Sequence, residues 1–170
     1  MQSPKINALH DEYKELIDFC RTNGQVSFEV SINDIYRKTL LLSAASYFEA
    51  VITQSILSFV DNASNRREIS ELVERKVVTR NYHTFFEWDG NNTNKFLVLF
   101  GEEFKTNARN AIRKEKLEEN EKAFLSLGNE RNKLVHLNYI EAPIDATFDE
   151  IYDKYTSALV FVEFIQNLLS

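Results

Sequence analysis

Arg131, Asn132 and His136 lie within six residues of one another and offer three chemically useful groups. If this segment is helical, Asn132 and His136 are i, i+4 neighbours on one face, and Arg131 lies about 100° round the helix from Asn132. Arginine offers phosphate oxygens a planar, permanently charged fork. Histidine titrates near neutral pH and can accept or deliver a proton. The combination suits phosphoryl transfer on RNA, because RNA supplies its own 2′-hydroxyl nucleophile.

The remaining composition argues against metal chemistry. Cys20 is the only cysteine, which excludes zinc sites built on cysteine pairs and any internal disulfide. None of the three histidines, His10, His83 and His136, has a second histidine three to five residues away. We therefore expect no metal and no cofactor, and we assign no role to His10 or His83. The single thiol, together with a start that lacks a signal-peptide pattern, favours the cytoplasm.

The scarcity of glycine and proline predicts a helical protein. Four Gly and two Pro in 170 residues amount to about 3.5%, against a typical ~12%. Tight hairpins and glycine-rich phosphate loops need more of these residues. A hydrophobic share of 44% and a charged share of 27% exclude disordered and collagen-like chains. The net charge of −6 argues against a protein that coats nucleic acid over its whole surface.

The first half of the chain predicts two helices joined by a connector. Ser3-Pro4 and Asn23-Gly24 mark the start and end of the first helix. Residues 26–30 alternate apolar and polar and are predicted to be extended. Residues 39–60 are strongly apolar but contain eight polar side chains, which favours a buried central helix over a membrane span.

The second half predicts four more helices around one loop. A helix is expected over residues 64–80, with Ile69, Leu72, Val73 and Val77 facing inward. Residues 83–94 are predicted to be a loop, whose Phe85, Phe86 and Trp88 either stack on bases or fold onto the core.

From Thr93 a helix is expected to run through Gly101 to Ala108. Another covers residues 117–138 and carries the Arg-His segment. Thr147 and Glu150 form a capping box that begins the last helix. The sequence thus predicts an all-α bundle of about six helices in a single domain of residues 1–170, with a helix and connector over 1–30 and a core over 31–170.

Two further features bear on the candidate site. Glu49 is the only charge in residues 39–60, so it needs a partner, either Arg131, which it would orient, or another arginine or a backbone group. Basic side chains at i, i+4, i+8 and i+11 form either a solvated face or a track for RNA. The candidate RNA-binding residues are Lys105, Arg109, Arg113, Lys116 and Lys133.

With nine Arg and three His in the chain, an arginine five residues before a histidine arises by chance with a probability of about 0.16, so the surrounding sequence matters. The segment 131–136 resembles the R-N-x-x-x-H motif of HEPN domains, an all-helical family. The likeness includes an aromatic-Glu pattern at residues 44–49 and an amphipathic closing helix over residues 151–169. Phe100-Gly101-x-x-Phe104 is similar to a motif of the bacterial MAE-type branch. The resemblance covers residues 30–168.

The resemblance implies a metal-independent endoribonuclease whose site forms between two protomers of a homodimer. Cleavage would leave a 2′,3′-cyclic phosphate and a 5′-hydroxyl. Carried over to this chain, Arg131 would hold the scissile phosphate, His136 would handle protons, and Asn132 would position the imidazole or the substrate. Such proteins often act as toxins or in phage defence, restrained by an antitoxin or a sensor protein. The alternatives are a non-catalytic HEPN module that binds a partner protein or a nucleotide, and a structural bundle with a chance motif.

Overall fold

The computed structural model describes residues 2–137, 139 and 141–170, and every regular element within them is a helix. This confirms the predicted all-α class. Between the longer helices lie a π-helical turn, η1 (Glu74–Val78), and two 3₁₀ turns, η2 (Tyr82–Thr84) and η3 (Val98–Phe100). The α-helices are α1 (Pro4–Thr22), α2 (Val26–Ala63), α3 (Arg67–Val73), α4 (Asn94–Leu97), α5 (Glu102–Glu115), α6 (Glu118–His136) and α7 (Phe148–Leu168).

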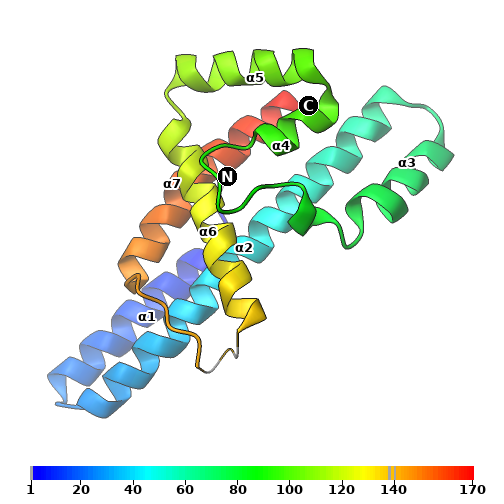
Figure 1. The fold of residues 1–170 in the computed structure, drawn as a ribbon. Coiled ribbons are helices and arrows are strands. Elements are labelled where there is room, and N and C mark those ends of the chain that lie inside the picture. The colour runs from blue at the N-terminus through cyan, green and yellow to red at the C-terminus, as the bar shows by residue number, and fades with distance from the viewer. Residues whose placement is uncertain (1, 138, 140) are drawn as a thin grey trace.

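The long helix α2 is the centre of the bundle. Its 38 residues span about 57 Å at 1.5 Å per residue, and α1, α6 and α7 pack against it. Figure 1 shows α1 and the first half of α2 as a hairpin at one end, while α5 crosses the other end. Among the described helices, α2 alone is long and apolar enough to cross a membrane, yet half of its most apolar window is buried inside the protein. That burial is typical of a central bundle helix.

The predicted connector at residues 26–30 is wrong, because these residues form the first turns of α2. The chain reverses at Gly24, whose φ of +65° favours glycine. An ion pair of 2.9 Å between Arg21 Nε and Glu29 Oε1 then joins the two helices. The apolar alternation suggested a strand, but Val26, Phe28 and Val30 are 63–69% exposed and face no sheet.

The helix predicted over residues 64–80 is shorter in the structure, and different side chains of this segment face the core. It consists of α3 followed by η1, and Ile69, Leu72 and Val77 are exposed rather than inward. A π-helical turn advances the chain by more residues per turn, which shifts the phase of an apolar stripe. Val78 is the buried residue of this segment instead. Figure 1 shows α3 standing out from the bundle beside the end of α2.

Gly101 also differs from the prediction, because it interrupts the helix expected over residues 93–108. Its φ of +104° ends η3 and places it at the N-cap of α5. A residue with a Cβ rarely adopts that conformation. By contrast, the capping box of α7 is confirmed: Thr147 Oγ1 accepts from Glu150 N at 3.2 Å, and Thr147 N donates to Glu150 Oε2 at 2.7 Å.

A buried carboxylate connects α6 with α5 and with the loop before α4. Glu121 is 1% exposed and accepts hydrogen bonds from both terminal nitrogens of Arg109. Its Oε1 also accepts from the backbone N–H of Thr93 at 2.6 Å and from the Thr93 hydroxyl at 2.7 Å. The four donors compensate the cost of burying the charge.

We expect Glu121→Ala to lower the free energy of unfolding by about 3–5 kcal/mol, because it leaves the Arg109 charge and the Thr93 donors without their acceptor. Glu119→Ala on the same helix is the matched control. The Glu119 side chain is 82% exposed and pairs with Lys122 at 2.7 Å, so its loss should cost less than about 1 kcal/mol. Urea unfolding followed by circular dichroism measures both values. Equal, small losses would contradict the structural role of Glu121.

Candidate functional site

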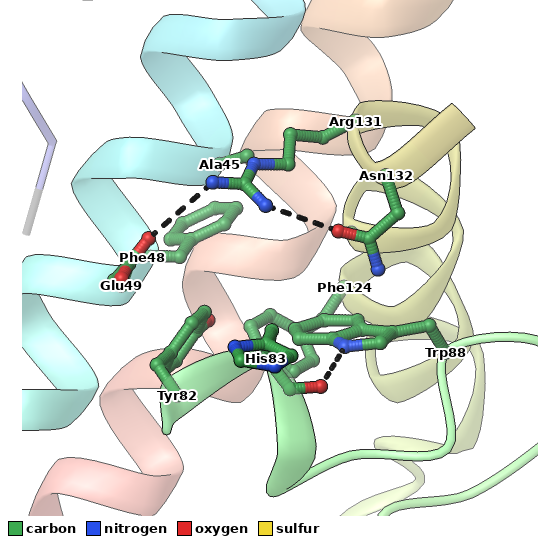
Figure 2. A pocket seen from close by; sticks show the side chains of 10 residues that line it. Ala45, Phe48, Glu49, Tyr82, His83, Trp88, Phe124, Arg131 and Asn132 are labelled. Atoms are coloured by element: carbon green, nitrogen blue, oxygen red, sulfur yellow. Dashed lines mark hydrogen bonds and ion pairs between the residues drawn. The ribbon is translucent and has the colours of Figure 1, made fainter. Parts of the chain in front are cut away.

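A crevice lies between α2, α6 and the segment that follows η1. The crevice is narrow: its cavity volume is about 10 Å³, and about 310 Å³ is reached only when all the space between the side chains and the solvent at the mouth is counted. Aromatic rings and Ala45 form its apolar wall, Gly128 lies on α6, and the polar groups come from Glu49, His83, Arg131 and Asn132 (Figure 2). The rings are those of Phe48, Tyr82, Trp88 and Phe124.

Arg131 reaches across the crevice from α6 toward α2. One terminal nitrogen donates to Asn132 Oδ1 at 3.1 Å, and the other lies 3.9 Å from Glu49 Oε2 (Figure 2). The second distance is an ion pair too long for a hydrogen bond. The guanidinium is thereby oriented while most of its five N–H donors stay available to a ligand. Of the partners that the sequence left open for Glu49, the structure places Arg131 beside it.

Trp88 forms the wall of the crevice opposite the guanidinium. A Cβ added at Gly128 would overlap two carbons of the Trp88 ring, so the ring lies directly against the backbone of α6. The ring also packs against Phe86 and Phe124, with centroids 4.8 and 5.7 Å apart. Phe85 and Phe86 are buried. The aromatic residues of this loop therefore fold onto the core, and only Trp88 reaches the crevice.

Tyr82 keeps its proton at the base of the crevice. Burial raises the pKa of its hydroxyl well above the ordinary value of 10.0, and the nearby Glu49 carboxylate raises it further, while Arg131 acts in the opposite direction. A phenol with so high a pKa is no general base at neutral pH. It contributes a neutral hydroxyl and an apolar ring.

His136 lies outside this crevice. It is the last residue of α6, is exposed, and makes no hydrogen bond or ion pair within the described part of the chain. Because Asn132 is four residues earlier, His136 follows it by about 6 Å along the same face of the helix. Val135, Leu137 and Tyr139 around it are also exposed. The structure thus joins Arg131, Asn132 and Glu49, and leaves His136 at the open end of the helix.

The four basic side chains of the predicted stripe on residues 105–116 are not equally exposed. Arg109 turns inward to Glu121, and Lys105 pairs with Glu102 at 2.5 Å. Lys116 follows the end of α5 in a left-handed conformation with φ +57°.

Arg113 and Lys116 are exposed. They belong to the end of the bundle that α5 crosses, away from the end of α6 that carries His136 (Figure 1). Lys133 is exposed near that end and lines a hollow with Leu137 and Pro143.

His83, to which the sequence assigned no role, also lines the crevice. No spacing rule links residue 83 to residue 131, and only the folding of the loop places both on one crevice. An indirect signal was available at Gly128, because a glycine inside a helix costs about 1 kcal/mol relative to alanine and so indicates a packing reason. That reason is Trp88.

The helical bundle, with an Arg-Asn pair facing a crevice and a histidine one turn later, defines a HEPN-type domain. The chain belongs to the RiboL-PSP-HEPN family, whose family model matches residues 7–170. The resemblance to HEPN domains is thereby confirmed, whereas the narrower likeness to the MAE-type branch is not. Neither the curated proteins nor the solved structures gave a match to the chain.

We expect Gly128→Ala to displace the ring of Trp88, because the new methyl group overlaps it. Trp88 is the only tryptophan, so its emission should shift to the red and become more accessible to acrylamide. Ser126→Ala, also on α6, is the matched control and should leave the emission unchanged. An unchanged spectrum for Gly128→Ala would contradict this packing.

Proposed function

We propose that the protein is a metal-independent endoribonuclease of a bacterial toxin or phage-defence system. HEPN domains are generally associated with ribonuclease activity, and the chain belongs to one of their families. The observation that carries the proposal is the held guanidinium of Arg131. Glu49 and Asn132 orient it at an open crevice, and its remaining donors suit the oxygens of a phosphodiester.

The proposed reaction needs only groups of the protein and the RNA. The 2′-oxygen bonds to phosphorus, the bond from phosphorus to the 5′-oxygen breaks, and a 2′,3′-cyclic phosphate and a 5′-hydroxyl result. Arg131 neutralises the charge that develops on the phosphate oxygens. His136 transfers a proton to or from a reacting oxygen. Asn132 holds Arg131 in place and lies on the substrate side of the helix.

A homodimer would complete this site. His136 and the exposed Val135, Leu137 and Tyr139 share the end of α6, and exposed apolar clusters are typical of interfaces. A two-fold contact between these ends would bury the apolar side chains and place the His136 of each chain near the crevice of the other. An antitoxin or a sensor protein would restrain the activity in the cell.

The second candidate function is a non-catalytic HEPN module. The separation of His136 from the crevice favours it, because a nucleotide or a partner segment can contact Arg131 without any catalytic histidine nearby. In this case the crevice would bind its ligand and release it unchanged.

Cleavage of a labelled structured RNA in the presence of EDTA separates the two functions. We expect the wild-type protein to produce cyclic-phosphate ends, and His136→Ala and Arg131→Ala to lower the rate at least about 100-fold. Lys122→Ala, an exposed substitution on α6, serves as the control and should cleave normally. Cleavage that is equal in all preparations indicates contamination, and the absence of cleavage across several RNAs favours the binding module.

Mixing two inactive variants tests the shared site. A dimer of one Arg131→Ala chain and one His136→Ala chain retains one site with both groups intact if they come from different protomers. After equal mixing, half of the dimers are of this kind, so activity should return to about a quarter of the wild-type value. Each variant alone stays inactive. Continued inactivity of the equilibrated mixture would place both groups within one protomer.

A further inference from the structure

His83 is the histidine that lines the crevice of Arg131 within the described residues, and the proposed mechanism gives it no task. It lies in η2, on the wall facing the guanidinium and the Asn132 amide (Figure 2). Its side chain is exposed, and its imidazole makes no hydrogen bond within the part of the chain that the structure describes. The ring nitrogens are therefore available to a ligand.

The backbone of His83 is anchored by the side chain of Trp88. Its carbonyl accepts a hydrogen bond of 2.8 Å from Trp88 Nε1. Trp88 is fixed in turn against Gly128, and the preceding Tyr82 is buried. The backbone that carries His83 is therefore anchored, whereas the imidazole itself makes no hydrogen bond among the described residues and would be oriented by a ligand bound in the crevice.

Transesterification of RNA involves two proton transfers. The attacking 2′-hydroxyl must lose a proton, and the departing 5′-oxygen must gain one. A single imidazole at the phosphate can assist only one of these transfers at a time. The crevice offers a second imidazole at the place where Arg131 would hold the phosphate.

We propose that His83 is the second catalytic proton-transfer residue, acting together with His136 on the phosphodiester bound by Arg131. One imidazole accepts the 2′-hydroxyl proton as the 2′-oxygen bonds to phosphorus. The other, as the imidazolium, donates a proton to the 5′-oxygen as its bond to phosphorus breaks. No redox change occurs and no further reactant is needed. This inference rests on the ribonuclease function proposed above.

The charged and titratable groups that share the crevice with His83 are few. They are Glu49 from α2, Arg131 from α6 and the neighbouring Tyr82. Carboxylates, guanidinium groups and phenols ordinarily titrate far from neutral pH, and burial moves the pKa of Tyr82 still further away. A change in the rate profile near neutral pH therefore reports on an imidazole, either that of His83 or that of the His136 which the other protomer would bring, and comparing His83→Asn with His136→Ala separates the two.

The test compares wild-type protein with His83→Asn in steady-state cleavage of RNA across pH 5 to 9. We expect kcat to fall at least about 100-fold, with KM within about threefold of wild type and one limb of the pH profile lost. Free imidazole should partly restore the rate of His83→Ala. His10→Asn, which removes a histidine stacked on Tyr152 of α7, is the control and should keep the normal profile.

The outcomes separate the two proposals. Wild-type cleavage that depends on His136 but is unchanged by His83→Asn overturns this inference and leaves the ribonuclease function intact. The absence of wild-type cleavage overturns the proposed function, and this inference with it. A change in the emission of Trp88 in His83→Asn would mean that the substitution also disturbs the packing of the loop. In that case, the imidazole rescue of His83→Ala distinguishes proton transfer from a structural role. Rescue supports proton transfer, and its absence assigns His83 a structural role.

Discussion

The close fit of Trp88 against Gly128 is the constraint on which the candidate site depends. Because α6 carries no side chain at position 128, the indole reaches the helix backbone, and its N–H then fixes the carbonyl of His83. Arg131 and Asn132 follow one turn later on the same helix. A single missing methyl group therefore sets the separation between the loop and the guanidinium.

The same helix secures this loop a second time by a different kind of interaction. Glu121 binds the backbone and hydroxyl of Thr93 at the far end of the loop and uses Arg109 to neutralise its charge. Positions 121 and 128 are seven residues apart and share one face of α6. Packing fixes one end of the loop and electrostatics the other. An irregular segment that faces solvent is thus anchored to α6 at both of its ends.

The sequence predicted correctly those helix ends that depend on neighbouring residues. It did not predict features that depend on contacts between distant parts of the chain. The ends of α1 and the capping box of α7 were predicted correctly, because proline, glycine and capping side chains act on neighbouring backbone. Residues 26–30 were predicted wrongly because their apolar side chains alternate with polar ones as in a strand, although they are exposed on a helix. Within the site, the adjacency of Arg131 and Asn132 was evident, whereas the partner of Glu49 depends on how α2 meets α6. The place of His83 depends on a loop fold that no spacing rule describes.

The separation of His136 from the crevice bears on how the proposed cleavage rate would depend on the concentration of the protein. If two chains must meet to complete one site, the cleavage rate at concentrations below the dimer dissociation constant grows with the square of the chain concentration. Slow background synthesis then leaves cellular RNA intact, while a burst of synthesis crosses a threshold. A site shared between two chains would thus keep the protein inactive at low abundance without an inhibitor.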